Sequence, residues 1–460
     1  MKKQINMLEG PLLSGILRFA FPIILTNLLQ ILYNTADKIV VGQYCGSLSI
    51  AAISATSTLT TLFVNFFIGF SVGTGVCVAR ALGGHKDEEV HRTVHTALPT
   101  AAICGGILSV VGIFFAPTIL AWMGTPKTVL PLSTLYIRVY FAGMVFNMVY
   151  NFSASILRAA GETKLPLYFL TIAGIVNVIL NVFFVTVFNM NVAGVALATA
   201  ISQALSAVLA VNALMRRTDA CRFIPRKIRI YGKQLLAIIR NGMPAGIQNS
   251  LFALSNMIIV SAINSFNSEA LISGHGAAAS LEAMNHAVAS GFSTTTTNYV
   301  GQNAGAHNYK RVRKIYYTCL GCVTPAVMAI SFTFFIFGET FLSLFITDSA
   351  EAISYGILRL IYMGLPYFLL GLMDCSTAAM RGLGYSLTPM FITLMGACGL
   401  RILWVYTVFE KFHTLPSLYI SYPISWIVTF LVLCIMVHIA LSKKTKTQNS
   451  SPQRSTIGRS

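Results

Sequence analysis

The segment GFSVGTGVCVARALGGHKDEEV at residues 69–90 returns at residues 291–312 as GFSTTTTNYVGQNAGAHNYKRV. Eight residues are identical at a constant offset of 222 positions, from Gly69 with Gly291 to Val90 with Val312. The same offset joins Pro22 to Pro244 and Asn27 to Asn249 upstream. Downstream, Arg158, Gly161 and Pro166 return one position later, as Arg381, Gly384 and Pro389. The chain is therefore a duplication of one unit.

Composition indicates a membrane protein. Of the 460 residues, 55% are hydrophobic and 10% are charged, whereas about a quarter of the residues of a soluble protein are charged. A helix needs about 20 apolar residues to cross a bilayer. Twelve segments meet that test, at about 14–42, 49–81, 93–121, 131–157, 165–188, 193–215, 234–265, 270–303, 312–337, 353–380, 386–409 and 417–441. The sequence thus predicts an all-α integral membrane protein with twelve transmembrane helices, six in each repeat.

The placement of basic residues predicts how the chain crosses the membrane. Most Lys and Arg residues lie at the termini or in loops after even-numbered helices, and the loops after odd-numbered helices hold only Lys127 and Lys411. By the positive-inside rule both termini are cytoplasmic, so the net charge of +18 does not require a nucleic-acid partner. Six helices per half make the repeats parallel, with two lobes around a central cavity, as in many secondary transporters. We expect a multi-pass protein of the cell membrane.

Polar segments divide the predicted chain. The N-terminal six-helix lobe covers residues 1–215, a basic cytoplasmic linker residues 216–233, and the C-terminal lobe residues 234–442. Residues 443–460, KKTKTQNSSPQRSTIGRS, have few apolar side chains and predict a disordered cytoplasmic tail. The basic start MKKQINMLEG precedes a long apolar helix without a small-residue cleavage site, which favours a retained first span. The nine cysteines are scattered and predict neither a disulfide framework nor a zinc site.

Polar residues inside the first predicted helix point to a functional site. Asn27, Gln30, Asn34 and Asp37 are spaced by three, four and three residues, so they share one helix face about 80° wide. Asp37 is the one carboxylate of this stripe. An intramembrane carboxylate is costly and is typical of ion pathways, and away from water it binds a proton more readily. We expect Asp37 to couple transport to an ion; the structural alternative is a fixed ion pair, for example with Lys38.

Two further carboxylates fall in predicted spans of the second half. Glu282 shares a helix face with Asn285, His286, Ser293 and Thr296, and Asp374 follows Tyr367 by seven residues. Each is a candidate substrate-binding group for positively charged cargo, with a structural bond between helices as the alternative. His286 is a weaker candidate, because a single histidine on a polar face more often packs than relays protons.

The fourth predicted helix has a surface of a different kind. Its members cluster within about 80° on the helical wheel and are Tyr136, Tyr140, Met144, Asn147 and Asn151. Aromatic faces attract organic cations, and methionine adapts to varied shapes. This surface is a candidate wall of a substrate pocket, with plain helix packing as the alternative.

Several motifs together resemble the multidrug and toxic compound extrusion (MATE) transporters. The run NTADKIVVGQYCG (34–46) resembles their first-helix signature, in which an aspartate precedes a Val-Gly turn. SVGTGVCVARALGGHKDEE (71–89) and FSTTTTNYVGQNAGAHNYKR (292–311) resemble the exits of their second and eighth helices. SILRAAGETKLP (155–166) and AAMRGLGYSLTP (378–389) look like their repeated Arg-x-x-Gly-x-x-x-x-Pro elements. The resemblance covers nearly the whole chain, with the motifs in the family's order.

The resemblance implies two six-helix lobes that open alternately to each side and export drugs in exchange for protons or sodium ions. Asp37 matches the family's first-helix coupling carboxylate, and Asn177 matches the asparagine of its fifth-helix Asn-x-x-x-Asp pattern. Asn181 stands where many members have the aspartate. This departure gives more weight to Glu282 and Asp374, which match acidic positions of some branches. The expected ion-coupling residues are Asp37, Asn34, Asn177 and Asn181, with Na⁺ near Asp37 as one alternative to H⁺.

Together these features predict secondary active multidrug efflux. The expected cargo is amphipathic organic cations such as drugs and dyes, exported by antiport against H⁺ or Na⁺ through alternating access, without a cofactor and by a monomer in the lipid bilayer. No His-Glu-x-x-His or other catalytic constellation appears, so we do not expect an enzyme. The loop GGHKDEEVHR lacks the Asp-Arg-x-Gly-Arg-Arg pattern of major facilitators. The alternative is a flippase-type exporter of lipid-linked saccharides, which would favour a strongly cationic cavity, whereas the predicted cavity charges are mostly acidic.

Overall fold

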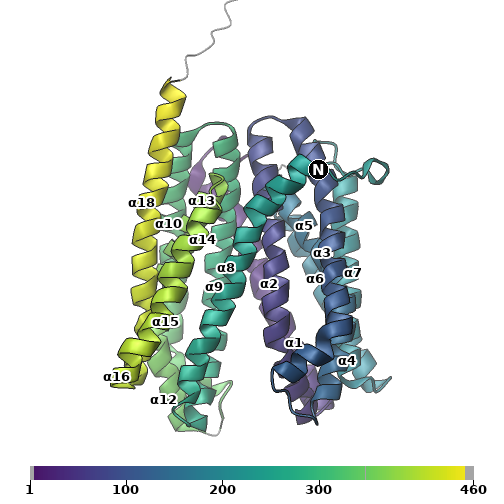
Figure 1. Cartoon of the computed structure of the whole chain (residues 1–460), viewed down its shortest axis with the longest axis vertical. Coiled ribbons are helices and arrows are strands. Elements are labelled where there is room, and N and C mark those ends of the chain that lie inside the picture. Colours follow the sequence, from purple (N-terminus) through teal and green to yellow (C-terminus); the bar gives the residue numbers. More distant parts are fainter. Residues whose placement is uncertain (1–4, 348, 451–460) are drawn as a thin grey trace, which may run out of the picture.

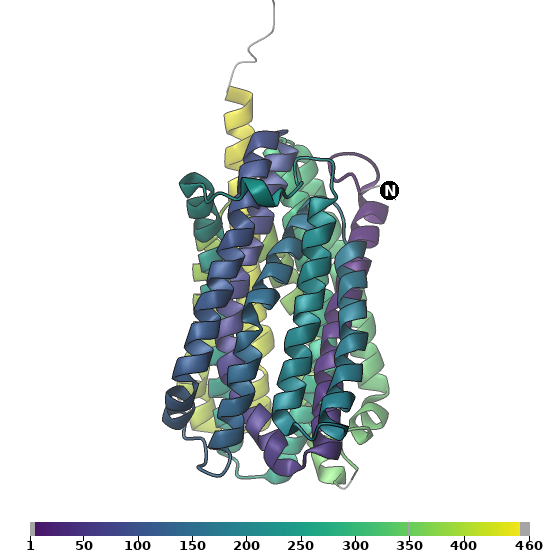
Figure 2. The same cartoon turned by 90° about the vertical axis from the view of Figure 1, so that its right-hand side faces the viewer.

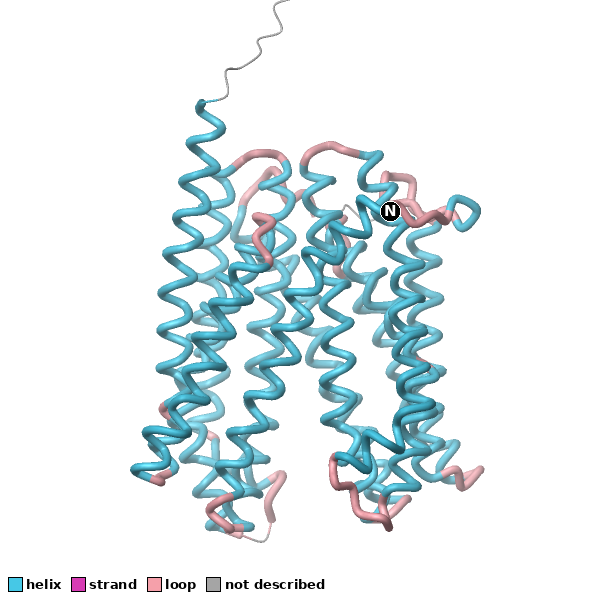
Figure 3. Tube along the Cα trace, viewed as in Figure 1, coloured by secondary structure: helices cyan, strands magenta, loops and turns pink. Residues whose placement is uncertain are grey.

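The computed structural model describes residues 5–347 and 349–450, which form helices and loops only (Figure 1, Figure 3). The first half contains α1 (Leu12–Tyr44), α2 (Ser47–Gly83), α3 (Asp87–Trp122), α4 (Leu130–Ala142), α5 (Met144–Ala159), α6 (Lys164–Thr186) and α7 (Asn191–Met215). After the short helix η1 (Pro225–Lys227), the second half contains α8 (Gly232–Asn264), α9 (Glu269–Gly305), α10 (Tyr309–Ile336), α11 (Gly338–Ser343), α12 (Ala350–Arg359), η2 (Leu360–Gly364), η3 (Leu365–Tyr367), α13 (Phe368–Gly382), α14 (Leu387–Thr393), η4 (Leu394–Gly399), α15 (Leu400–Trp404), η5 (Val405–Phe409), α16 (Glu410–Phe412), α17 (Leu415–Tyr419) and α18 (Ser421–Ser450).

The long helices run along the long axis of the molecule (Figure 1, Figure 2). Among the described residues, ten helical segments are long and apolar enough to cross a membrane, and the bent pair α4 and α5 makes an eleventh. The twelfth predicted span corresponds to α9, which has 37 residues but too polar a sequence to pass the same test. It packs against α1, α2, α10, α12 and α13, and most of its residues are buried. The expected twelve-helix, two-lobe architecture is confirmed.

Two predicted spans are broken at equivalent positions of the repeat. The span expected at 131–157 is split at Gly143, where α4 and α5 meet at 45°. In the second half the corresponding position is Pro366, in a stretch where η2 and η3 interrupt α12 and α13. Proline cannot donate the helical hydrogen bond, and glycine weakens a helix. Different residues thus interrupt the same span in both lobes.

The two halves contact each other with the symmetry of the duplication. A Cβ atom on Gly69 of α2 would overlap the backbone of Gly246 on α8, and one on Gly291 of α9 would overlap Ile24 of α1. These are repeat-related pairs, because Gly291 is the copy of Gly69 and Gly246 stands at the repeat position of Ile24. The lobes are therefore related by a pseudo-two-fold axis between them, as expected for a parallel repeat.

The lobes meet mainly at one end of the molecule, which we call the terminal end because the N-terminus and the last turns of α18 lie there (Figure 1). Gln302 of α9 donates to the Ala159 carbonyl at 2.7 Å. A Cβ atom on Gly83 would overlap Gln302, and one on Gly305 would overlap Arg80. All these contacts involve the ends of α2, α5 and α9 that face the terminal end. At the opposite end the lobes diverge (Figure 3).

Residues 5–11 cross the terminal end and bind both lobes. The Ile5 amide donates to the Gly161 carbonyl at 3.4 Å in the first lobe. The side chain of Asn303, in the second lobe, donates to the Met7 carbonyl at 3.0 Å. Met7 itself is fully buried. This segment therefore has to detach from one lobe if the terminal end is to open.

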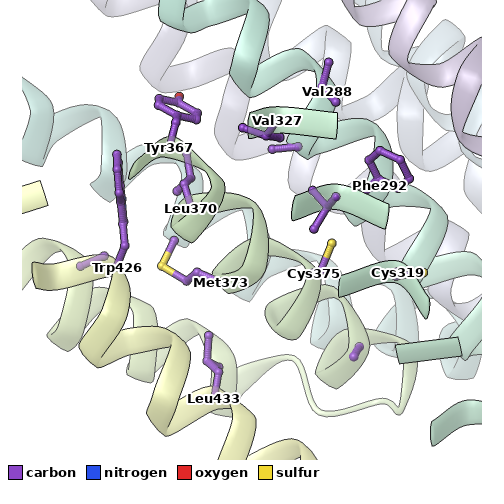
Figure 4. Packing of buried hydrophobic residues seen from close by; sticks show 14 of the residues in the cluster. Val288, Phe292, Cys319, Val327, Tyr367, Leu370, Met373, Cys375, Trp426 and Leu433 are labelled. Atoms are coloured by element: carbon purple, nitrogen blue, oxygen red, sulfur yellow. The ribbon is translucent and has the colours of Figure 1, made fainter. Parts of the chain in front are cut away.

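The largest apolar core joins the second lobe to the first half of α1, because Ile16, Phe19 and Ile23 pack into it. In the second lobe, side chains from α9, α10, α13 and α18 interdigitate (Figure 4). Its labelled members include Phe292, Cys319, Met373, Cys375 and Leu433, all buried. The first lobe has a separate core between α2, α3 and α5.

One boundary prediction is wrong. The tail was expected to be disordered from residue 443, but α18 continues as a helix to Ser450. Lys and Thr residues are tolerated in a helix that projects beyond the apolar span, and they need no packing there. The rest of the predicted tail, 451–460, lies outside the described residues.

Candidate functional site

A pocket of ≈ 500 Å³ lies within the first lobe, in the half of the molecule away from the terminal end. It is enclosed by α1, α2, α4, α5, α6 and α7. Most of the residues predicted for ion coupling and for the aromatic wall line it together, namely Asn34, Asp37, Tyr136, Tyr140, Asn147, Asn151 and Asn177. The two sets expected from separate helices therefore form one site.

Asp37 ends a chain of hydrogen bonds that crosses the lobe. Asn181 of α6 donates to the Asp37 carboxylate and also to Asn177 Oδ1, the latter at 3.2 Å. Asn177 donates in turn to Thr199 Oγ1 of α7 at 3.4 Å. Asn181 is fully buried and Asn177 is 5% exposed. The network fixes the Asp37 carboxylate against α6 while leaving it at the pocket surface.

One acceptor of this network is unused. Asn181 Oδ1 is buried without a hydrogen-bond partner among the described residues. A buried carbonyl oxygen without a partner costs about 1–3 kcal/mol. The same side-chain amide uses its nitrogen to donate to Asp37, so this oxygen is one unpaired polar atom of the network.

A glycine sets the position of the Asp37 helix. A Cβ atom on Gly174 of α6 would overlap the ring of Tyr33, one turn before Asp37 on α1. The Tyr33 hydroxyl donates to the Thr171 carbonyl at 3.4 Å. Because α1 and α6 approach this closely, Asp37 comes within hydrogen-bond reach of Asn181.

The opposite wall of the pocket is aromatic and amide-rich. The rings of Tyr136 and Tyr140 stack with centroids 5.8 Å apart and planes 15° apart. Asn151 donates to Asn147 Oδ1 at 3.0 Å, so the two amides hold each other in place. Met144 does not contribute to this wall, contrary to the prediction, and is fully buried in the core of the first lobe. Met144 directly follows the bend at Gly143, whereas Asn147 and Asn151, further along α5, line the pocket as predicted.

Glu282 is not a free cavity carboxylate. It accepts two hydrogen bonds from Arg359 of α12, Nε to Oε1 at 3.0 Å and Nη2 to Oε2 at 2.6 Å. Glu282 is 4% exposed and Arg359 7%. Arg359 also packs against His275, which contacts the Tyr419 hydroxyl at 3.2 Å. The structure therefore supports the alternative to substrate binding, in which Glu282 forms an ion pair between α9 and α12.

Asp374 and His286 also lie outside the first-lobe pocket. Asp374, on α13, is within electrostatic reach of His286 and Arg381. Ser293 of α9 donates to the Asp374 backbone carbonyl at 3.3 Å. The second lobe thus brings the two predicted groups close to each other but separates them from Asp37.

Two arginines within the predicted spans of the second lobe make buried contacts that were not predicted from the sequence. Arg359 pairs with Glu282, and Arg401 is 2% exposed beside Ser425 and Tyr422, with its guanidinium 4.0 Å from the Tyr422 ring centroid. The interior of the second lobe therefore holds basic as well as acidic side chains. These arginines could have been identified from the sequence, because burying an arginine inside a span is as costly as burying an acid and requires a partner.

Comparison with known proteins agrees with this architecture. The family model described as MatE matches residues 22–183 and 244–407, one match in each lobe. The chain belongs to the MatE family. The two matched ranges correspond to the two repeats, so the duplication read from residues 69–90 and 291–312 is a property of the family fold.

Named relatives of this MatE-family chain are bacterial transport proteins. It is 26% identical over 442 residues to the "Probable multidrug resistance protein YoeA" of Bacillus subtilis (strain 168), covering 94% of each chain. It is 25% identical to an "FAD transporter" of Shewanella oneidensis, covering 78% of this chain and 80% of the relative. It also shares the fold of a solved "Outward-facing conformation of a multidrug resistance MATE family transporter of the MOP superfamily", with a TM-score of 0.90, 21% identity, and coverage of 97% and 99%.

Proposed function

We propose that this MatE-family protein exports amphipathic organic cations from the cell by antiport against H⁺ or Na⁺. The observation that carries the proposal is the meeting of Asp37, held by Asn181, with the Tyr136/Tyr140 wall in one pocket. A carboxylate beside stacked aromatic rings suits a cation with an apolar body. The relatives named as multidrug resistance proteins support this cargo class.

Coupling follows from competition at Asp37. As a carboxylate it attracts the cationic cargo, and with a bound proton or Na⁺ that attraction is lost, so each ligand lowers the affinity for the other. The Asn181 Oδ1 atom without a partner supports this role. It can accept a hydrogen bond from protonated Asp37 or serve as an oxygen ligand for Na⁺. Asp37, Asn177 and Asn181 then act as a coupling unit, with Asn34 at the pocket surface beside it.

Alternating access uses the two lobes. The lobes contact each other at the terminal end, and their backbones diverge at the opposite end (Figure 3). With both termini in the cytoplasm, as the basic loops predict, this arrangement is outward-open, and the pocket lies on the open side. Opening the terminal end would require separation of Gln302 from Ala159 and release of residues 5–11.

The available gradients are sufficient for this work. One pH unit supplies about 1.4 kcal/mol per proton, and each charge moved through 100 mV supplies about 2.3 kcal/mol. Exchange of one monovalent cation for one proton moves no net charge and uses the ion gradient alone. We propose a monomer in the cell membrane that acts without a cofactor and performs no chemical conversion. The buried arginines pair with Glu282 or with Tyr422, away from the pocket, so they give little support to a lipid-linked saccharide exporter.

The proposal is tested with purified protein in sealed liposomes. An imposed pH or Na⁺ gradient should drive accumulation of a fluorescent cationic dye such as ethidium, and the effective gradient identifies the coupling ion. Liposomes with no protein and liposomes with both gradients collapsed are the controls. Dye movement that is the same with and without every gradient would contradict antiport.

Asn181 is expected to tune the coupling site without being indispensable. Replacing Asn181 by Ala removes a hydrogen bond to a charged group, worth about 1.5–3 kcal/mol. We expect gradient-driven export about tenfold slower than wild type but still dependent on the gradient, because Asp37 keeps its charge. Thr186→Ala, an exposed change on the same helix, is the matched control. Complete loss in folded Asn181→Ala protein would instead make Asn181 an obligatory ion ligand.

A further inference from the structure

The first-lobe pocket contains a positive charge that the cation-export proposal does not use. Lys38 lines the same pocket as Asp37. The other lining residues carry no formal charge, so the pocket holds one acid and one base. As neighbours on a helix, the two side chains point about 100° apart, which places the charges at separate points of the pocket surface.

The two charges do not neutralise each other by direct contact. The ion pairs of the described chain involve Glu89, Glu88, Asp219 and Glu282, and none of them reaches Lys38. The Asp37 carboxylate is instead occupied by the Asn181 amide. Lys38 is exposed and is one of the residues that line the pocket, and no ion pair of the described residues occupies its ammonium group.

This arrangement changes what the pocket attracts. With Asp37 ionised the lining has no net charge, and with Asp37 protonated it has one positive charge. A simple cation is attracted by Asp37 and repelled by Lys38. A molecule with a cationic group and an anionic group satisfies both, provided that its charges are separated by an apolar body.

We propose that Lys38 is a specificity-determining residue that binds an anionic group of the cargo. This deepens the proposed export function and rests on it. The preferred cargo is an aromatic zwitterion, with its cationic group at Asp37, its carboxylate or similar anion at Lys38, and its ring system against Tyr136 and Tyr140.

The assignment has an energetic consequence for transport. A zwitterion leaves with no net charge, so its exchange for one proton moves one positive charge inward. The membrane potential then drives the exchange, which it cannot do for the one-for-one exchange of a monovalent cation. Protonation of Asp37 also leaves Lys38 as the sole charge of the lining, which repels the cationic group and aids release.

Binding of rhodamine B and its ethyl ester tests the assignment. The two dyes share a fluorophore, but the first carries a free carboxylate and the second is a simple cation. Binding to the purified full chain is measured by fluorescence anisotropy without any gradient. We expect wild type to prefer rhodamine B, and Lys38→Met to reduce that preference about tenfold, equivalent to about 1.4 kcal/mol. Lys38→Arg should retain the preference.

The controls separate this assignment from the export proposal. Lys127→Met removes an exposed lysine of the same lobe that does not line the pocket, and it should leave the ratio unchanged. Undiminished binding of the ester by Lys38→Met shows that the variant is folded. A ratio of affinities that is the same in wild type and Lys38→Met overturns the role of Lys38. Absence of gradient-driven export overturns the proposed function separately, because the binding ratio needs no gradient.

The membrane potential provides a second, independent readout. In liposomes at equal pH and Na⁺ on both sides, a potassium diffusion potential should drive export of rhodamine B by wild type and leave export of the ester unchanged. An equal response of both dyes to the potential would contradict the proposed binding of the anionic group.

Discussion

Replacing Asp37 by Asn is expected to abolish gradient-driven export. The amide has nearly the size of the carboxylate and can still contact Asn181, but it cannot change charge. The cargo and the coupling ion then no longer compete, because the negative charge that attracts both of them is absent. The measurement is dye transport in sealed liposomes under the effective gradient, which we expect to fall at least a hundredfold, close to the rate of protein-free liposomes.

The matched control is Asp87→Asn, which neutralises an exposed carboxylate at the start of α3, outside the pocket. It should transport at the wild-type rate. The Asp37 variant should elute as a single species with an unchanged thermal midpoint. Transport by Asp37→Asn at the wild-type rate, at equal protein content, would rule out the coupling role.

Replacing Glu282 by Gln is expected to destabilise the second lobe. The change leaves the buried guanidinium of Arg359 without its counter-ion, a loss typically worth about 3–5 kcal/mol. Unfolding can be followed with a thiol-reactive dye, since buried cysteines such as Cys319 and Cys375 become accessible only when the lobe opens. We expect a markedly lower thermal midpoint than wild type.

Two further variants test the origin of that effect. Glu269→Gln neutralises an exposed acid of the same helix and should leave the midpoint unchanged. The paired replacement of Glu282 and Arg359 by Met removes both charges, and it should recover most of the lost stability. A double variant that is no more stable than Glu282→Gln would show that the ion pair is not the source of the stability.

The overall fold could be predicted because it depends on features that are local in sequence. Long apolar runs specify spans, and the matches from Gly69 to Val90 specify two equivalent halves. The bend at Gly143 could not be placed, because a single glycine within an apolar run is also tolerated in straight helices. The helical extension to Ser450 was missed because composition separates polar from apolar residues, whereas a helix can continue into water.

The candidate site was predictable where one helix carried the signal. The stripe on α1 identified Asp37 and Asn34, and the aromatic wall identified Tyr136 and Tyr140. The prediction for Met144 is wrong: it is the first residue of α5 after the bend and is buried in the core, a local break that a helical wheel does not show. The ion pair of Glu282 could not be predicted, because its partner Arg359 lies 77 residues away in sequence and no local pattern reveals such a pair. The sequence offered Lys38 only as a partner for a fixed ion pair with Asp37, whereas in the structure it lines the pocket without that ion pair.

The polarity of α9 has a consequence for how the protein is made. A helix enters the bilayer from the translocation channel only if its own side chains favour lipid over water, and α9 lacks the apolar content of the other spans. Its polar run Thr294–Asn298 is accommodated in the finished protein by contacts with both lobes. During synthesis the α1 and α2 surfaces are already present when α9 emerges, whereas α10, α12 and α13 are not. We therefore expect contacts with α1 and α2 to assist the insertion of α9, and we expect the second half expressed alone to integrate with α9 outside the membrane.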